Sequence, residues 1–337
     1  MPFSEVVGHA RPLGLLSRSI ARGSLPPSLL FTGPEGVGKR LVAQAVAQAL
    51  NCVSPRAGDA GRPFDACGAC PACRRIARGT HPDVVVIEPG DSGAIKIEPI
   101  RQVIAAAGYR PFEGRRRVVI VDEADRVTGD AQDALLKNLE EPSPSSAFIL
   151  VSSRPETLLS TVRSRCSRLR FGPLSPAEVA RLLVDRHEYD EREAHAAAAL
   201  SDGSPGRALD AGSRAFHDAR DAALGVLRTV AGARSPRERL GAASLLLSGK
   251  SGAREREELG TRLRMLASLA RDIALLSHGA PAEGAANVDL ANELEALAGR
   301  LGGARAIRVF AAADKAGAAL ARNANPKVVA SWLAVRM

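Results

Sequence analysis

The N-terminal half of the chain alternates short apolar runs with longer amphipathic stretches. The apolar runs have the length of buried strands and occupy Leu29–Thr32, Val84–Glu88, Val118–Val121, Phe148–Ser152 and Arg168–Phe171. The stretches between them carry apolar residues at helical spacing, as in Leu41–Leu50. Strands that alternate with helices predict a parallel α/β sheet covered by helices, with a ligand site at the carboxyl ends of the strands.

A predicted domain boundary follows the last of these strands, at the turn Gly172–Leu174. A helix start comes directly after it, with Ser175 as N-cap, Pro176 at the first helical position and Glu178 three residues after the cap. This signal predicts a small helical domain that begins at residue 173 and ends at about residue 212.

The rest of the chain has only helical periodicity. Its clearest apolar stripe recurs at three- and four-residue steps through Leu259, Leu263, Leu266, Ala270, Ile273 and Leu276. Such a stripe packs against other helices. We therefore expect three domains: an α/β domain over 1–172, the small helical domain over 173–212 and an all-α domain over 213–337.

Length, composition and charge add limits to this picture. The chain has 337 residues, 45% of them hydrophobic, and a formal net charge of +9. Two or three domains with real cores are therefore expected, and an acidic partner such as nucleic acid suits the charge. The first residues have no basic segment followed by an apolar one, and no run of 18 apolar residues occurs. We predict a cytoplasmic protein without a membrane span.

The loop after the first strand matches the nucleotide-binding P-loop, Gly-x4-Gly-Lys-Ser/Thr, at every position except the last. Gly33, Gly36 and Gly38 allow backbone N–H groups to turn toward phosphate, and Lys39 would reach the β- and γ-phosphates. Arg40 stands where a hydroxyl residue should hold Mg²⁺. An arginine can neutralise phosphate charge but cannot coordinate a metal, which places a bound Mg²⁺ in doubt.

A second nucleotide-site motif follows the strand Val118–Val121. An apolar strand that ends in Asp-Glu has the Walker B pattern, in which Asp122 would bind Mg²⁺ and Glu123 would activate water. An acidic helix start after a core strand explains the same residues without a function. Two motifs in the expected order favour the nucleotide site.

The cysteines form the third motif. Cys52, Cys67, Cys70 and Cys73 follow the pattern C-x14-C-x2-C-x2-C, within a predicted insert of about residues 52–73. Four thiolates are typical of a closed, structural Zn²⁺ site, and disulfides are not expected in a cytosolic protein. An iron–sulfur cluster is the alternative, but the usual C-x3-C-P continuation is missing. The pattern favours zinc.

These motifs and several further segments resemble one family, the delta-prime subunits of the bacterial DNA polymerase III clamp loader, which are AAA+ proteins. The cysteine insert directly after the P-loop helix is typical of the delta-prime and gamma/tau subunits. The other segments that carry the resemblance are Val7–His9, Leu29–Gly33, His81–Asp83, Asp130–Pro142, Phe148–Ser153 and Ser164–Cys166. The resemblance covers nearly the whole chain. It implies an AAA+ P-loop domain, a small helical lid domain and a C-terminal helical collar domain.

The resemblance also implies residue roles. Arg165 would be an arginine finger that acts in trans on ATP held by a neighbouring subunit, a role that a rigid guanidinium suits. Ser152 or Ser153 fits the polar sensor position that responds to the γ-phosphate. Arg207 resembles a second sensor, although its offset from the gamma-type pattern is one residue. An ordinary surface ion pair is the alternative for Arg165.

The function expected from the resemblance is that of a delta-prime clamp-loader subunit. Such a subunit helps to load the sliding clamp onto primer-template DNA, has gamma/tau-type and delta-type partners, and shows little or no ATPase of its own. It holds a structural Zn²⁺, and its P-loop retains the residues for ATP or ADP. The intact Lys39, Asp122 and Glu123 leave an ATP-hydrolysing gamma/tau-type motor as an alternative. A non-enzymatic, metal-dependent nucleic-acid-binding protein is the other.

Overall fold

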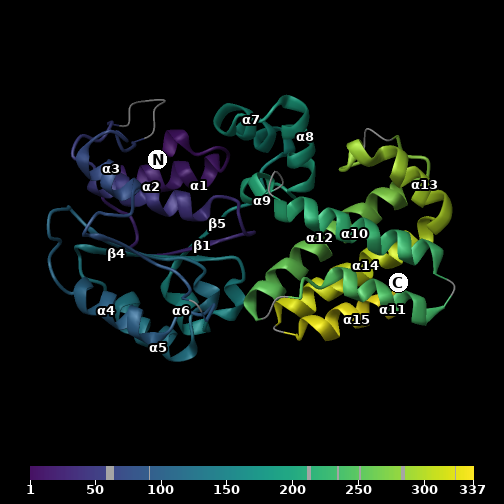
Figure 1. Ribbon diagram of the computed structural model, residues 1–337. Coiled ribbons are helices and arrows are strands. Elements are labelled where there is room, and N and C mark those ends of the chain that lie inside the picture. Colours follow the sequence, from purple (N-terminus) through teal and green to yellow (C-terminus); the bar gives the residue numbers. More distant parts are fainter. Residues whose placement is uncertain are drawn as a thin grey trace. The chain divides into compact units, whose positions relative to one another are not determined.

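The computed structural model describes residues 1–57, 64–90, 92–210, 214–233, 235–249, 252–281, 285–322 and 324–337. These residues fall into two compact units (Figure 1). The first comprises Met1–Glu178 with Gly203–Gly206, and the second comprises Val179–Asp202 with Arg207–Met337.

The first unit is built on a parallel five-stranded sheet of order β2-β3-β4-β1-β5. Its strands are β1 (Ser28–Thr32), β2 (Val84–Ile87), β3 (Arg117–Val121), β4 (Ser146–Ser152) and β5 (Ser167–Arg170). Every predicted strand is therefore present, with ends shifted by one or two residues. The parallel α/β fold predicted from the alternation is confirmed.

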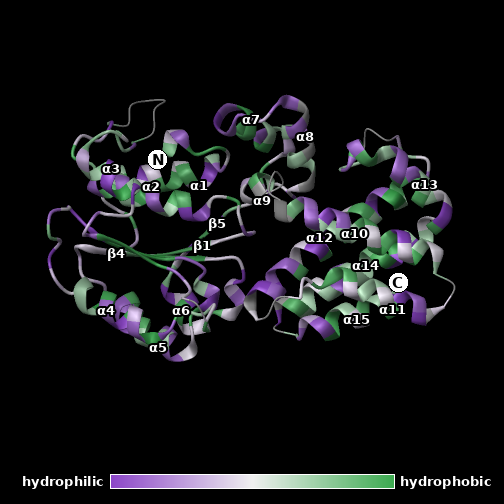
Figure 2. Cartoon of the chain, in the orientation of Figure 1, coloured by the Kyte–Doolittle hydropathy of each residue, from purple (hydrophilic) through white to green (hydrophobic). Residues whose placement is uncertain are grey.

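Helices cover both faces of this sheet (Figure 1). One face carries α1 (Ala10–Ala21), α2 (Lys39–Asn51) and α3 (Pro71–Ala77), and the other carries α4 (Ile97–Ala107), α5 (Gly129–Glu140) and α6 (Ser160–Arg165). Short 3₁₀ turns occupy Phe3–Glu5, Ala124–Arg126 and Pro155–Thr157. Strand residues alternate between the two faces. Leu29 and Phe31 belong to the core under α2, whereas Leu30 belongs to the core over α4 and α5, and Figure 2 shows these strands as hydrophobic.

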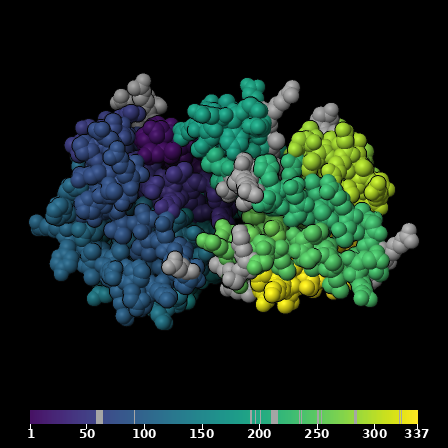
Figure 3. Space-filling model, in the orientation of Figure 1, coloured from purple at the N-terminus to yellow at the C-terminus, as the bar shows by residue number. Residues whose placement is uncertain are grey.

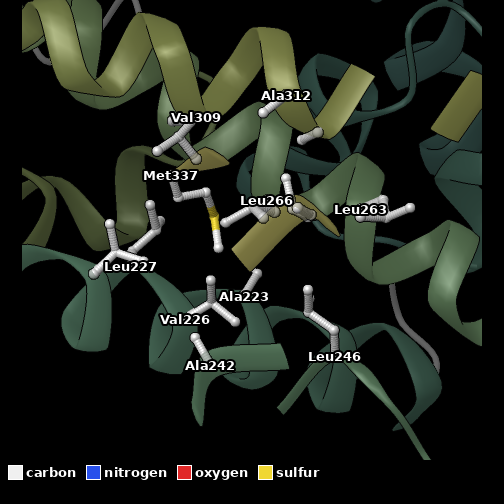
Figure 4. Close-up of a cluster of buried hydrophobic side chains, with 14 of the residues drawn as sticks. Ala223, Val226, Leu227, Ala242, Leu246, Leu263, Leu266, Val309, Ala312 and Met337 are labelled. Carbon is white, nitrogen blue, oxygen red and sulfur yellow. The ribbon is translucent and has the colours of Figure 1, made fainter. Parts of the chain in front are cut away.

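Within the described residues of the second unit, every regular element is a helix. Its helices are α7 (Pro176–His187, which begins in the first unit), α8 (Glu191–Leu200), α9 (Pro205–Asp210), α10 (Arg214–Gly232), α11 (Pro236–Leu246), α12 (Ala253–Ser277), α13 (Ala291–Leu301), α14 (Gly303–Ala321) and α15 (Pro326–Arg336), with a 3₁₀ turn at Val288–Leu290. In its core, Leu263 and Leu266 of α12 lie among side chains of α10, α11 and α14 (Figure 4). The predicted stripe of α12 is thus buried, with Leu276 at its partly buried end.

The predicted helix start at residue 175 is a complete capping box. The Glu178 backbone N–H donates to Ser175 Oγ at 3.2 Å, and Glu178 Oε2 accepts from the Ser175 N–H at 2.8 Å. The division into three domains stays a prediction. Its boundary between residues 212 and 213 lies outside the described residues. Within those residues, no helix is long and apolar enough to cross a membrane.

A buried carboxylate fixes the loop that leads into β3. Asp83, which is fully buried, accepts hydrogen bonds from the backbone N–H groups of Phe112 (2.7 Å), Glu113 (2.9 Å) and Gly114 (2.8 Å), and it pairs with Arg117 Nη2 at 3.0 Å. Burial alone would raise the pKa of Asp83, but these hydrogen bonds lower it to about 2. The segment His81–Asp83 that contributes to the resemblance therefore has a structural role here.

This carboxylate makes stability depend on pH. Because its pKa is lowered from 3.8 to about 2 by folding, its contribution is present above pH 4 and is lost as the pH falls toward 2. We expect Asp83→Asn to lower the free energy of unfolding by about 2 kcal/mol at pH 7 and much less at pH 2. Denaturant unfolding over this pH range measures the difference. Asp133→Asn, at an exposed position of α5, is the control, and equal losses for Asp83→Asn at both pH values would contradict the assignment.

Candidate functional site

The P-loop joins β1 to α2 with the backbone geometry that its glycines require. Gly33 has a φ of +149°, and a Cβ atom there would lie 2.1 Å from the carbonyl oxygen of Phe171. Gly38 has a φ of +99° and directly precedes the first residue of α2. Only glycine adopts these conformations without strain. The loop therefore presents the N-terminus of α2 at the carboxyl edge of the sheet, which is favourable for an anion.

Lys39 is the first residue of α2, and its side chain turns back into the loop. Its Nζ donates to the carbonyl oxygens of Gly33 (2.8 Å) and Pro34 (2.6 Å), and the residue is only 6% exposed. Burial lowers the pKa of this ammonium. Its acceptors are neutral, and no carboxylate forms an ion pair with it within the described part of the chain.

Arg40 points across the sheet edge instead of toward its own loop. Its Nη1 forms ion pairs with Asp122, at 3.3 Å, and with Glu88. Glu88 follows β2 and Asp122 follows β3, so that one guanidinium joins the ends of two strands to the P-loop helix. The predicted Walker A and Walker B residues are thereby brought into direct contact.

The acidic pair after β3 is held in a turn. The Glu123 backbone has a φ of +46° and its N–H donates to Asp122 Oδ1 at 3.0 Å. The Glu123 carboxylate pairs with Arg126 Nε at 2.6 Å. Burial raises the pKa of Glu123 although Arg126 acts in the opposite direction. A carboxylate with a raised pKa is suited to accept a proton, but this one is occupied by an arginine.

The predicted sensor residues are bound to an acidic residue in the turn that follows the neighbouring strand, β3. Asp125 Oδ1 accepts from Ser152 Oγ at 3.0 Å and from the Ser153 backbone N–H at 3.1 Å, and Asp125 Oδ2 pairs with Arg154 Nη2 at 3.1 Å. Burial alone would raise the pKa of Asp125, but these interactions lower it. The network fixes the end of β4 against the turn after β3.

Arg165 lies apart from this group, as the last residue of α6. Its Nε donates to Glu140 Oε1 at 2.5 Å, its Nη2 pairs with the same carboxylate, and its Nη1 donates to the Thr161 carbonyl oxygen at 2.9 Å. The side chain is 32% exposed. These contacts hold the guanidinium in one orientation at the surface.

Arg207 belongs to the second unit, in α9, and pairs with Asp202 at 3.4 Å. The structure thus groups Lys39, Arg40, Asp122 and the serines at one sheet edge, and this group includes neither Arg165 nor the cysteines.

The four cysteines of the insert meet in one cluster. Their sulfur atoms all lie within 4.8 Å of one another, and the Sγ atoms of Cys52 and Cys70 are 4.0 Å apart. A tetrahedral zinc ion with Zn–S bonds of about 2.3 Å holds its sulfurs about 3.8 Å apart. The cysteine sulfurs that ligate a cluster of several iron atoms lie farther apart than the sulfurs around one ion. The donor set and its size therefore fit a single structural metal ion such as zinc, with no coordination position left open.

Backbone N–H groups point at these sulfurs. Cys67 N–H donates to Cys52 Sγ and Cys70 N–H to Cys67 Sγ, both at 3.3 Å. Burial would raise the pKa of the Cys70 thiol, but hydrogen bonds lower it to about 6, whereas burial raises the pKa of Cys73. A thiolate is the form that binds metal, so the N–H groups favour the charged cluster.

The cluster also connects the elements on its face of the sheet. Cys52 caps α2 and Cys70 caps α3, while Gln48 of α2 donates to the Cys73 carbonyl oxygen at 2.8 Å. Asp65 of the insert accepts from the backbone N–H groups of Phe3 and Ser4. In the space-filling view, the purple N-terminal part of the chain lies beside the blue part that follows it in sequence (Figure 3).

Sequence reasoning missed three residues of the nucleotide-site edge. Glu88 is the last residue of a predicted strand, Arg154 lies two residues after another, and Asp125 ends the Walker B segment. Charged residues directly after buried strands were the available signal. Their partners depend on the strand order, which the sequence pattern leaves open.

Comparison with known proteins gives a family match over the first unit. The family model described as DNA polymerase III, delta subunit, matches residues 8–175. The delta' subunit of DNA polymerase III from Pseudomonas aeruginosa is 37% identical over 179 residues, which are 52% of this chain and 52% of that protein. The delta' subunit from Bacillus subtilis is 32% identical over 176 residues, 52% of this chain and 51% of that protein.

Subunits of the tau type match at a similar level. The DNA polymerase III subunit tau of Salmonella typhimurium is 31% identical over 211 residues, covering 62% of this chain and 32% of the relative. The chain thus spans about half the length of the delta' relatives and about a third of the tau relative. Sequence identity alone does not separate the two types.

Proposed function

Because this chain belongs to the DNA polymerase III delta-prime and gamma/tau clamp-loader family, we propose that it is a delta-prime-type clamp-loader subunit with little ATPase of its own. In this role it assembles with gamma/tau-type and delta-type subunits, and the complex places the sliding clamp on primer-template DNA. The basic net charge of +9 suits phosphate contacts that carry no sequence readout.

The observation that carries the delta-prime choice is the position of Arg40. A motor subunit needs a hydroxyl there to hold Mg²⁺, and Mg²⁺ neutralises the charge that develops on the transferring phosphoryl group. Here a guanidinium takes that place and pairs with Asp122, the other residue that would hold the metal. An arginine offers no lone pair to a cation. The residues at this edge therefore do not fit Mg²⁺, and no hydrolytic step is assigned to them.

A gamma/tau-type motor remains the second candidate. Lys39, Asp122 and Glu123 are all present, and the tau relative, at 31% identity, is nearly as similar as the Bacillus subtilis delta' relative, at 32%. Glu123 also pairs with Arg126, but both side chains are nearly half exposed, so this pair does not decide between the two types. An unrelated nucleic-acid-binding protein would not account for the family match.

Two further roles are part of the proposal. The cysteine cluster holds a structural zinc ion, whose four sulfur ligands close its coordination and whose contribution is to the stability of the insert. Arg165 is an arginine finger for an ATP site on the adjacent subunit. Ser152, Ser153 and Arg207 keep their proposed sensor roles.

Turnover of the isolated chain separates the two candidate types. We expect phosphate release by the purified chain with ATP and Mg²⁺ to be no higher than that of Lys39→Ala, because the site lacks a metal ligand at position 40. Appreciable turnover that Lys39→Ala abolishes would favour the motor. Size-exclusion chromatography with gamma/tau-type and delta-type subunits accompanies the assay, and a chain that does not co-elute with them is not a clamp-loader subunit.

A further inference from the structure

The charged groups at the sheet edge engage the carboxylate that a metal ion would need, and they leave one buried ammonium without a direct carboxylate partner in the described ranges. Both oxygens of the Asp122 carboxylate are engaged, Oδ1 by the Glu123 N–H at 3.0 Å and Oδ2 by Arg40 at 3.3 Å. Mg²⁺ requires close to six oxygen ligands at about 2.1 Å. A metal ion bound to Asp122 would lie beside a guanidinium that keeps its charge, and the two cations would repel each other.

The ammonium without a direct carboxylate partner is that of Lys39. Its ammonium is almost fully buried and its acceptors are two carbonyl oxygens of its own loop. Asp122, Asp125 and Glu35 lie near enough to act on this charge, but none of them pairs with it directly among the described residues. An anion that enters the loop would give the buried ammonium a direct partner. The loop glycines and the N-terminus of α2 are arranged for the same anion.

Arg40 is placed to act on that anion as well. It is the residue next to Lys39, its side chain is 43% exposed, and its two carboxylate partners lie on loops after β2 and β3. An exposed arginine exchanges one oxyanion partner for another at small cost, since its pairs there are weak. The fork of a guanidinium binds phosphate oxygens in a bidentate manner.

We propose that the P-loop binds a nucleoside polyphosphate without Mg²⁺, with the Arg40 guanidinium in the role that the metal has in a motor subunit. Two adjacent cations, Lys39 and Arg40, then neutralise the phosphates. The nucleotide is held in the loop and is not turned over. This inference deepens the proposed function because it concerns the same loop, but it does not depend on assembly with other subunits.

Calorimetric titration of the purified chain with ATP, and separately with ADP, tests the proposal in Mg²⁺ and in EDTA. We expect the dissociation constant of the wild-type chain to differ by less than about twofold between the two buffers, since no bond to the metal exists. Arg40→Thr restores the hydroxyl and should bind at least about tenfold more tightly with Mg²⁺ than with EDTA. Arg40→Gln should weaken binding in EDTA by about tenfold, the effect of one charged hydrogen bond.

The controls separate binding from folding and from assembly. Arg101→Gln removes an exposed arginine from α4 and should leave both dissociation constants unchanged. Lys39→Ala should abolish binding in either buffer. Wild-type binding that weakens tenfold in EDTA, binding that is absent in both buffers, or Arg40→Gln that binds as the wild type does would overturn the proposal. Co-elution with the other subunits is an independent measurement. Failure of nucleotide binding can therefore be distinguished from failure of the clamp-loader assignment.

Discussion

If Arg165 is the proposed arginine finger, Arg165→Ala is expected to lower hydrolysis at the neighbouring subunit's ATP site roughly a thousandfold. The structure supports the assignment through the way in which the side chain is held. Glu140 binds the Nε edge of the guanidinium, and the Thr161 carbonyl oxygen accepts from Nη1. A guanidinium fixed in one orientation stabilises developing charge without reorganisation during the reaction.

The assay requires the complete complex with clamp and primed DNA. Phosphate release by the complex should fall by the amount that one ATP site contributes. Assembly, measured by size-exclusion chromatography, should stay intact. Arg163→Ala is the matched control, because Arg163 lies on the same helix and is exposed.

The alternative for Arg165 is a surface ion pair with Glu140, and the two interpretations predict different results. An ion pair of partly exposed groups contributes roughly 0–1 kcal/mol to stability, and its loss would leave catalysis unchanged. On that interpretation Arg165→Ala and Glu140→Ala would have the same small effect on the melting temperature and none on turnover. An arginine finger predicts a large effect of Arg165→Ala and a smaller one of Glu140→Ala, which loosens the side chain. Unchanged DNA-stimulated turnover in Arg165→Ala would refute the finger.

The sequence predicted the sheet well because buried parallel strands are almost continuously apolar. The observed ends of β4 and β5, for example, differ from the predicted ends. β4 begins at Ser146, two residues before the apolar run, because the Ser146 hydroxyl donates to the Ala107 carbonyl oxygen at 2.8 Å. β5 ends before Phe171, although the Phe171 N–H still bonds to Thr32 at 2.7 Å. Hydropathy contains no signal for either feature.

The motifs of the site could be predicted, but their contacts could not. Local spacing identifies Lys39 and Arg40, whereas the pairing of Arg40 with Glu88 requires β2 to lie beside β3. The hydrogen bonds of Asp125 with Ser152 likewise require β3 beside β4. These contacts join residues far apart in the chain, and only the strand order brings them together. From the sequence, Arg40 is only the replacement of a metal ligand. The contacts with Glu88 and Asp122 are what support the proposal that its charge takes the place of the metal.

The cysteine cluster is the opposite case, because its geometry follows from local spacing. Cys67, Cys70 and Cys73 are separated by two residues each, and the N-terminal turn of α3 places the last two on one side. Only the position of Cys52 depends on tertiary structure, and it lies at the end of α2, next to which the insert folds back.

We expect the purified chain to contain one zinc ion and Cys70→Ser to lose it, with a marked loss of stability in the first unit. Metal binding of this kind is coupled to folding, because the four thiolates converge only in the folded chain. If free zinc exceeds the dissociation constant a thousandfold, the bound ion contributes about 4 kcal/mol. The loss should appear as a lower melting temperature, since Gln48 and Asp65 connect the insert to α2 and to the N-terminal turn.

Metal analysis and thermal unfolding test this together. Cys166→Ala is the matched control, because Cys166 is buried outside the cluster and its substitution should leave the zinc content unchanged. If Cys70→Ser does not fold, chelation of the wild-type chain replaces it: removal of zinc should lower the melting temperature and added zinc should restore it. A visible absorption band in the purified protein would indicate iron instead. Unchanged zinc content and melting temperature in Cys70→Ser would mean that the four sulfurs, though close enough to share one ion, do not hold it.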